Sequence, residues 1–284
     1  MRTMIFPARL LLLTAFSVLA SSSVFSQSPA TQADLDYQTA AVLYMQKAAE
    51  YRALAYQAFN IARLRLDADM DRKNVKRLPK SERKRPRAIV VDIDETVLDN
   101  SPSQARGIRE GRPFNADDWY AWGRTRKAKA IPGAVEFLNY AASKGVRVFF
   151  VSNRDEIQKP ETIDNLKSAG FLEVTSDNVM LRQTDANGRH ISTKEPRRLA
   201  ISTGYRIVLM IGDNLDDFSG AFERKNFAER FAATDEAKAS WGERWIVLPN
   251  AMYGTWENAI YDYKAATMSD KEKAERRAAA LELP

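Results

Sequence analysis

The sequence predicts an α/β fold with a doubly wound, mainly parallel sheet and a small helical cap. Short apolar runs rich in Val and Ile recur between residues 88 and 248, and segments of helical length separate them. Alternating strands and helices of this kind are typical of parallel sheets covered on both faces. Polar residues directly follow several of these runs. Because ligands bind at the carboxyl edge of such sheets, we expect the functional site there.

The first 26 residues have the pattern of an export signal. Arg2 and Arg9 provide positive charge, an apolar run covers residues 10–20, and small residues precede Gln27. The run is shorter than an ordinary membrane span. We therefore predict a signal peptide over residues 1–26 and a periplasmic or secreted product, with a retained anchor as the alternative.

The composition excludes several classes of site. The chain has no cysteine, which excludes disulfides, thiolate metal sites and a lipid anchor on an N-terminal cysteine. Its single histidine, His190, lies in a polar stretch, which argues against histidine-based catalysis. The 43 basic and 37 acidic residues are interspersed and give a net charge of +6. This balance suits a small anionic substrate, and we expect no nucleic-acid partner.

Residues 27–86 are predicted to form a helical segment and a linker. Apolar residues recur at helical spacing from 31 to 70 without Gly or Pro, which indicates one long helix or two joined helices. Residues 73–87 are rich in Lys and Arg and contain Pro79 and Pro86. We interpret them as a solvated connector, with a nucleic-acid patch as the alternative.

The first expected strand, residues 88–91, runs directly into the motif Asp92-x-Asp94-x-Thr96. Two carboxylates crowded at the end of a buried strand raise one another's pKa unless a cation lies between them. The motif therefore predicts a metal-assisted reaction centre. A simple capping turn is the alternative.

The remaining elements complete a core over residues 87–268, with a cap insertion at about 97–130 and a charged helical tail over 269–284. The expected strands are 146–151, 179–181, 207–211 and 245–248, and the expected helices are 134–143, 161–169 and 194–203.

Three expected strand ends carry polar side chains that should meet at one edge of the sheet. They are Asp92 with Asp94, Ser152 with its neighbours, and Asp213. Asp217 follows Asp213 by four residues, so a helix starting there would place both on one face. Oxygen ligands without nitrogen or sulfur favour a hard divalent cation, most simply Mg²⁺.

Two further residues suit the binding of a phosphoryl group. Ser152 offers a hydroxyl, and Lys194 offers a positive charge, although Lys167 lies upstream as an alternative. Together with the carboxylates they predict phosphoryl transfer. The chain lacks a Gly-x-x-x-x-Gly-Lys loop, which argues against a P-loop nucleotidase.

The order of these motifs resembles that of the haloacid dehalogenase superfamily. Four longer strings resemble one branch of it, the class C acid phosphatases, which include bacterial lipoprotein 5′-nucleotidases. These strings are Asp92–Pro102, Ile131–Phe137, Gly212–Phe218 and Leu248–Trp256. The resemblance extends over about residues 35–265 and implies a Rossmann-like core.

The resemblance implies specific roles for the acidic residues. Asp92 matches the nucleophile that forms a phosphoaspartate, and Asp94 matches the general acid and base. Asp92, Asp94 through its backbone carbonyl, and Asp213 match the Mg²⁺ ligands, with Asp217 as a supporting carboxylate. Thr96 matches the residue that orders this loop.

The resemblance also implies residues that hold the substrate. The implied phosphate-binding residues are Ser152, Asn153 and Lys194. The implied residues for the remainder of the substrate are Phe114, Trp119, Arg154 and Tyr253. Flat aromatic rings accept a nucleobase by stacking, whereas packing in the core is the alternative for these rings.

We therefore expect a metal-dependent acid phosphatase that hydrolyses phosphomonoesters, above all nucleoside monophosphates, through a phosphoaspartate. A broad-specificity phosphatase or phosphotransferase is one alternative. A non-catalytic exported ligand-binding protein is another. Base preference and oligomeric state stay open.

Overall fold

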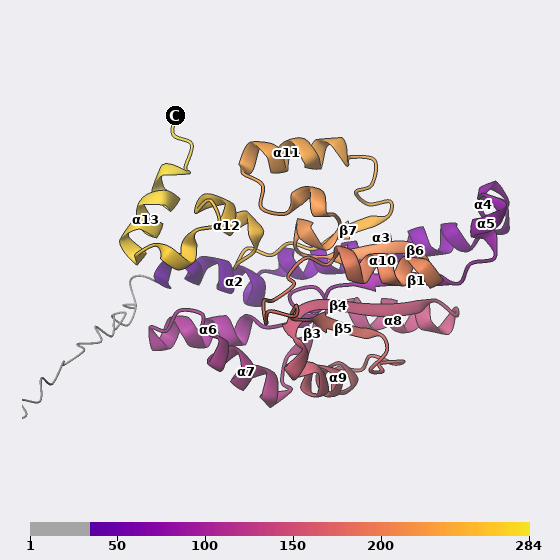
Figure 1. Cartoon of the computed structure of the whole chain (residues 1–284), viewed down its shortest axis with the longest axis horizontal. Helices are drawn as coiled ribbons and strands as arrows, with labels where there is room; N and C mark the ends of the chain where they lie inside the picture. The colour runs from indigo at the N-terminus through magenta and orange to yellow at the C-terminus, as the bar shows by residue number, and fades with distance from the viewer. Residues whose placement is uncertain (1–34) are drawn as a thin grey trace, which may run out of the picture.

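The computed structural model describes residues 35–284, so the predicted signal peptide lies outside the described range. A five-stranded sheet with the order β5-β4-β1-β6-β7 forms its centre (Figure 1). Every neighbouring pair in this sheet is parallel, which confirms the predicted α/β fold class. The strands are β1 (Arg87–Val91), β4 (Arg147–Asp155), β5 (Val179–Arg182), β6 (Arg206–Gly212) and β7 (Trp245–Val247).

After Arg87, the central strand β1 is apolar, because both of its faces are buried. Ile89 and Val91 belong to the large core that α3 (Ala49–Met70) and α8 (Ala134–Ser143) help to form. Ala88 and Val90 pack on the other face, in a smaller cluster with Ile201 of α10 (Glu195–Gly204). Successive strand residues point to opposite faces. The sheet is therefore covered on both sides, as doubly wound folds require.

The N-terminal segment forms two joined helices. After the short helix η1 (Asp36–Gln38), α2 (Thr39–Lys47) and α3 meet at Ala48, whose extended backbone interrupts the helix. The expected connector differs, because it contains the short helices α4 (Arg72–Arg77) and α5 (Lys80–Arg83). The Asp71 side chain caps the first of them by accepting a hydrogen bond from the Lys73 backbone N–H at 2.7 Å.

The cap insertion contains a small antiparallel sheet and two helices, and the helices α6 and α7 lie toward the opposite end of the molecule from α4 and α5 (Figure 1). The strands β2 and β3 bracket the helices and pair through Leu98 with Ala130. Its elements are β2 (Leu98–Asp99), α6 (Ser101–Glu110), α7 (Ala116–Thr125) and β3 (Lys129–Ala130).

The remaining described helices lie outside the central sheet. They are η2 (Glu156–Gln158), α9 (Lys159–Ser168), η3 (Leu215–Asp217), η4 (Gly220–Phe222), α11 (Phe227–Glu236), α12 (Thr255–Ile260), η5 (Ala265–Thr267) and α13 (Asp270–Ala279). Helix α11 was not expected from the sequence, although Asn226 and Glu229 form a capping box at its start. In the described part of the chain, no helix has both the length and the apolar character needed to cross a membrane.

Candidate active site

The candidate site lies where β1, β4 and β6 end side by side. Asp92 follows β1, Ser152 lies near the end of β4, and Asp213 follows β6. These strands are direct neighbours in the sheet, so their carboxyl ends share one edge. The convergence expected from the sequence is therefore present.

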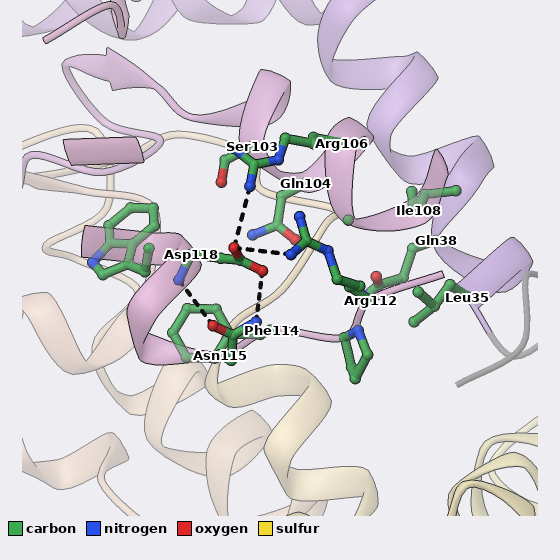
Figure 2. Close-up of a pocket in the computed structure, with 13 residues that line it drawn as sticks. Leu35, Gln38, Ser103, Gln104, Arg106, Ile108, Arg112, Phe114, Asn115 and Asp118 are labelled. Carbon is green, nitrogen blue, oxygen red and sulfur yellow. Dashed lines mark hydrogen bonds and ion pairs between the residues drawn. The ribbon is translucent and has the colours of Figure 1, made fainter. Parts of the chain in front are cut away.

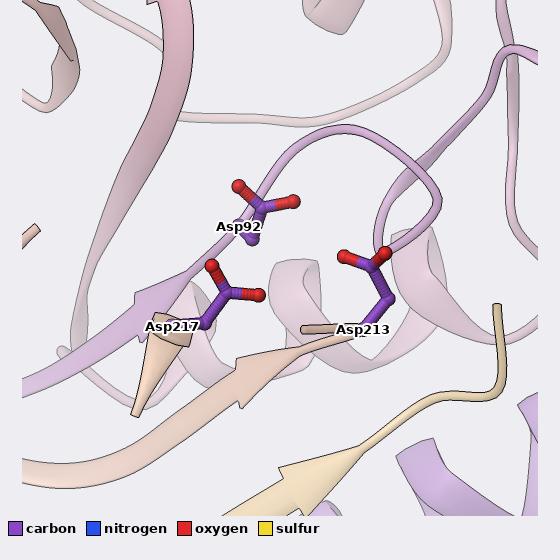
Figure 3. A group of neighbouring side chains, drawn as sticks. All are labelled: Asp92, Asp213 and Asp217. Carbon is purple, nitrogen blue, oxygen red and sulfur yellow. The ribbon is translucent and has the colours of Figure 1, made fainter. Parts of the chain in front are cut away.

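Asp92, Asp213 and Asp217 form a cluster of carboxylates (Figure 3). Each offers an oxygen that lies within 4.8 Å of the others. The Thr96 hydroxyl lies 3.1 Å from Asp213 Oδ1 and 3.3 Å from Asp92 Oδ2, so it can donate to either. Asn250 Nδ2 donates to Asp213 Oδ2 at 2.8 Å.

Asp217 reaches this cluster through a tight turn instead of the expected helical stacking on Asp213. The turn is the 3₁₀ helix η3, and Asp217 Oδ2 accepts from the Asn214 backbone N–H at 3.0 Å. Arg198 Nη1 donates to the Asp217 carbonyl at 2.8 Å. Gly212 makes the approach possible, because a Cβ there would lie 2.6 Å from Asp217 Cβ.

A Gly212→Ala substitution is therefore expected to displace Asp217. We expect about a 10-fold or greater loss of phosphate-release activity, together with a loss of about 1–3 kcal/mol in the free energy of unfolding. Steady-state kinetics and denaturant unfolding measure the two effects. Gly204→Ala is the matched control, because a Cβ there meets nothing within 4 Å. An active Gly212→Ala protein with unchanged stability would contradict this account of the turn.

Lys194 lies among the carboxylates at the start of α10. Its Nζ contacts Asp92 Oδ1 and lies 2.6 Å from Asp217 Oδ1. Although burial alone would lower it, the pKa of Lys194 is raised above its ordinary value by the Asp217 and Asp92 carboxylates. The ammonium group is therefore held charged beside the expected nucleophile.

Asp94 lies outside the carboxylate cluster and has its own partners. Its Oδ1 accepts from Arg154 Nη2 and from Asn100 Nδ2, each at 2.8 Å. Ser152 Oγ lies 3.1 Å from Asp94 Oδ2. Arg154, which was expected to contact the substrate, is buried and forms its ion pair with Asp94.

The expected phosphate-binding residues Ser152 and Asn153 differ in their exposure. Ser152 is buried and Asn153 is exposed. Arg197 holds both, because its Nη1 donates to the Ser152 carbonyl at 2.6 Å and its Nη2 donates to Asn153 Oδ1 at 2.7 Å.

The expected substrate-binding aromatics come from two separate segments. Phe114 and Trp119 are neighbours, with 6.4 Å between ring centroids, and they line a pocket bordered by α6 and the start of the described chain (Figure 2). The Arg154 guanidinium lies 5.4 Å from the Trp119 ring centroid, which connects this pocket to Asp94. Tyr253 lies in the loop after β7 and is partly buried against the core.

The pocket beside Phe114 has a charged wall. Asp118 Oδ1 accepts from Arg106 Nη2 at 3.1 Å and lies 3.3 Å from Arg112 Nη1 (Figure 2). Asn115 Nδ2 donates to Asp118 Oδ2 at 2.7 Å. The pocket therefore combines exposed aromatic surface with hydrogen-bonding groups.

Comparison with known proteins identifies the family. The model of the HAD superfamily, subfamily IIIB (acid phosphatase), matches residues 13–256. The chain belongs to this family. The sequence-based assignment to the haloacid dehalogenase (HAD) superfamily and its acid phosphatases is thereby confirmed, as is the HAD-like fold.

Two solved structures support the family assignment over almost the whole chain. The class C acid phosphatase from Bacillus anthracis is 39% identical, with a TM-score of 0.80, and the alignment covers 89% of this chain and 100% of that one. A crystal structure of the Bacillus anthracis enzyme with tungstate bound is 40% identical, with a TM-score of 0.79, and covers 88% and 98% of the two chains.

Two curated plant proteins match a shorter part. Acid phosphatase 1 from Solanum lycopersicum is 28% identical over 134 residues, which are 46% of this chain and 52% of the relative. Vegetative storage protein 2 from Arabidopsis thaliana is 28% identical over 130 residues, which are 45% of this chain and 48% of the relative. The chain thus spans about half the length of these curated relatives.

In this member of the acid phosphatase family, the cluster has more negative than positive charge. The cluster has three carboxylates, and the ammonium of Lys194 contacts two of them, Asp92 and Asp217. Burial raises the pKa of Asp92 to about 7, and the nearby Asp217 and Asp94 charges add to the effect. Burial, followed by the charges of Asp217 and Asp92, also raises the pKa of Asp213 well above its ordinary value. A divalent cation would neutralise the excess, and the all-oxygen donor set suits one.

The raised pKa values predict how stability depends on pH. A carboxyl whose pKa is higher in the folded than in the unfolded state stabilises the fold below its unfolded pKa. That contribution declines as the pH rises through the folded pKa. The relevant window runs from the ordinary value of 3.8 to about 7 for Asp92. We expect the metal-free protein to melt at least about 5 °C lower at about pH 8 than at about pH 5.

Calorimetry in EDTA and in Mg²⁺ checks this expectation. Mg²⁺ should restore much of the loss at about pH 8, because a cation that binds only the folded state stabilises it. Equal melting temperatures at the two pH values in EDTA would contradict it. So would a melting temperature at about pH 8 that does not respond to Mg²⁺.

Four residues that support the expected site residues were not predicted from the sequence. Arg197 and Arg198 follow Lys194 by three and four positions on α10, a spacing that places them next to it. Asn100 and Asn250 each lie within a motif string that carried the family resemblance. Their proximity to the motifs was the available signal, but their contacts depend on the folded chain.

Proposed function

We propose that this chain is a metal-dependent acid phosphatase that hydrolyses phosphomonoesters, with nucleoside monophosphates as preferred substrates. The observation that carries the proposal is the placement of Asp92. It lies at a strand end, in contact with Lys194 and within one carboxylate cluster with Asp213 and Asp217, in a chain of the acid phosphatase family.

Asp92 is the proposed nucleophile, and Asp94 is the proposed general acid and base. An Asp92 oxygen attacks phosphorus, the bond to the leaving oxygen breaks, and Asp94 donates a proton to that oxygen. Asp94 then accepts a proton from the water that hydrolyses the phosphoaspartate and releases inorganic phosphate. The separate location of Asp94, paired with Arg154 outside the carboxylate cluster, supports this division of roles.

Asp92, Asp213 and the Asp94 backbone carbonyl are the proposed ligands of Mg²⁺, with Asp217 in support. The cation would supply neutralising charge for the phosphoryl oxygens. Ser152, Asn153 and Lys194 are proposed to bind the phosphoryl group. The burial of Ser152 and Lys194 favours this role, because charges and dipoles act more strongly away from water.

Phe114, Trp119 and Tyr253 are proposed to bind the nucleoside, and the Arg154 guanidinium lies 5.4 Å from the Trp119 ring centroid. The Phe114 ring is 74% exposed, which supports a stacking role because most of its surface is free to contact a base. The export-signal pattern of residues 1–26 supports a periplasmic or secreted product.

A panel of phosphate-release assays tests the proposal. AMP, a sugar phosphate and p-nitrophenyl phosphate are each assayed with Mg²⁺ and with EDTA. We expect release only with the metal, and kcat/KM at least about 10-fold higher for AMP than for the sugar phosphate, with Tyr253→Ala removing much of that difference. Equal values for all esters would favour a broad-specificity phosphatase. Nucleotide binding without any release would favour a non-catalytic binding protein.

A further inference from the structure

Asn100 joins the proposed general acid to the cap helix α7. Its side chain is fully buried, and its Nδ2 donates to Asp94 Oδ1 at 2.8 Å. On its other side, Asn100 Oδ1 accepts from Trp122 Nε1 at 2.8 Å and lies 3.4 Å from Arg154 Nη2. One amide group therefore connects α7, Arg154 and Asp94.

The position of Asn100 in the chain indicates that this connection is not a by-product of local structure. Asn100 is the N-cap residue of α6, where an Asn side chain normally accepts a hydrogen bond from its own helix. It makes no such bond, and Asp99 Oδ1 accepts from the Ser101 N–H at 2.9 Å instead. The Asn100 side chain is thereby left for Asp94.

The backbone of Asn100 is also held in place, by the side chain of Glu95. The fully buried Glu95 accepts a hydrogen bond from the Asn100 N–H at 2.7 Å through Oε1. Glu95 adopts a left-handed backbone conformation, with φ of 59°, which is uncommon for a residue with a side chain. Glu95 belongs to the turn that separates Asp94 from Asn100 in the chain.

Trp122 determines which end of the Asn100 amide faces Asp94. An indole N–H can only donate, so the atom that it contacts must be the amide oxygen. The amide nitrogen must then face Asp94 Oδ1, which can only accept from it. Arg154 Nη2 also donates to this oxygen at 2.8 Å, whereas Arg154 Nε is shared between Oδ1 at 3.0 Å and Oδ2 at 3.2 Å.

The second carboxyl oxygen of Asp94 has a different neighbour. Oδ2 lies 3.1 Å from Ser152 Oγ, and a hydroxyl can accept as well as donate a hydrogen bond. A proton on Oδ2 can therefore be donated to Ser152 Oγ. Within the described chain, Oδ1 contacts only hydrogen-bond donors, so a proton on Oδ1 would have no acceptor.

We propose that Asn100, oriented by Trp122, is a positioning residue that fixes the Asp94 carboxyl with its transferable proton on Oδ2. This inference rests on the proposed phosphatase function and on the role of Asp94 in it. When the ester bond breaks, the proton moves from Oδ2 to the leaving oxygen, and Asp94 becomes a carboxylate held by Asn100 and Arg154. Loss of Asn100 or of the Trp122 N–H lets the carboxyl rotate and weakens this proton transfer.

The test compares two aryl phosphate esters whose leaving oxygens differ in how strongly they require protonation as the ester bond breaks. Phenyl phosphate and p-nitrophenyl phosphate have the same ring, but phenolate is a much poorer leaving group than p-nitrophenolate. We expect Trp122→Phe to lower kcat/KM for phenyl phosphate by about 10-fold and Asn100→Ala by about 100-fold. For p-nitrophenyl phosphate both losses should stay within about 3-fold. We compare kcat/KM because this constant includes the first chemical step, in which the leaving group departs.

Trp241→Phe is the matched control. Trp241 Nε1 also donates a single hydrogen bond, to the Thr234 carbonyl at 3.0 Å, and this partly buried indole belongs to an aromatic cluster with Phe218. Its loss should leave the ratio between the two esters unchanged. Trp122→Phe decides the question if Asn100→Ala does not fold.

Equal losses on both esters, for variants whose circular dichroism matches the wild type, would overturn the positioning role. A wild-type protein that releases phosphate from neither ester would instead overturn the proposed function. The two failures are therefore distinct.

Discussion

Asp92→Asn is expected to abolish phosphate release, with kcat/KM reduced by about 10⁴-fold or more. An amide of the same shape can keep the packing at the end of β1, but it cannot attack phosphorus as a carboxylate does. The loss should appear with every phosphomonoester, because in the proposed mechanism each one passes through the same phosphoaspartate. Phosphate release from p-nitrophenyl phosphate and AMP measures it.

The stability of Asp92→Asn separates a chemical from a structural cause. Burial raises the pKa of Asp92 to about 7 in the metal-free protein. The Asp92→Asn protein has a neutral side chain at this position, so in EDTA at about pH 8 its melting temperature should equal or exceed that of the wild type. Asp262→Asn, which alters an exposed pair with Arg276, is the control and should keep full activity. Wild-type turnover by Asp92→Asn would eliminate the proposed mechanism.

Lys194→Met is expected to produce the second largest effect. It removes the only ammonium in contact with Asp92 and Asp217 within the described chain. We expect kcat/KM to fall by about 10²–10³-fold, because a fixed positive charge is lost from the proposed phosphate site. The free energy of unfolding in EDTA should fall by about 3 kcal/mol, the usual cost of leaving buried charges without their partner.

Kinetics and urea unfolding with and without Mg²⁺ check this prediction. The variant should gain more stability from Mg²⁺ than the wild type does, because more negative charge is then left for the cation to neutralise. Lys225→Met, which breaks an exposed pair with Glu229, should change stability by no more than about 0.5 kcal/mol. Wild-type kcat/KM for Lys194→Met would exclude Lys194 from the proposed phosphate site.

The different positions of the Asp92 and Asp94 side chains show why the motif alone did not predict the partners of each carboxylate. The motif placed both carboxylates at the end of a buried strand, and their separation by one residue suggested a shared cation. In the fold, Asp92 joins Asp213 and Asp217, whereas the Asp94 side chain pairs with Arg154. Side chains two residues apart after a strand can turn to different partners once the loop leaves the sheet. The positive φ of Glu95, directly after Asp94, marks that departure.

The tight turn after β6 gives a second example. The four-residue spacing of Asp213 and Asp217 suggested an α-helical face, but the 3₁₀ helix η3 and the close approach to Gly212 bring the two together differently. Both geometries place the carboxylates near each other, so the expected proximity held although the expected helix did not. Short turns are decided by packing against the sheet, which sequence spacing does not report.

The sequence by itself determined the class of fold, the strand that ends in Asp92 and the strand that ends in Asp213. It could do so because strand-forming apolar runs and the polar residues after them are local features. Only the tertiary structure decided that Asn100, Arg197, Arg198 and Asn250 support these residues. Their partners lie on other segments, such as Trp122 on α7 for Asn100. Such contacts depend on strand order and side-chain packing, and no local pattern in the chain contains either.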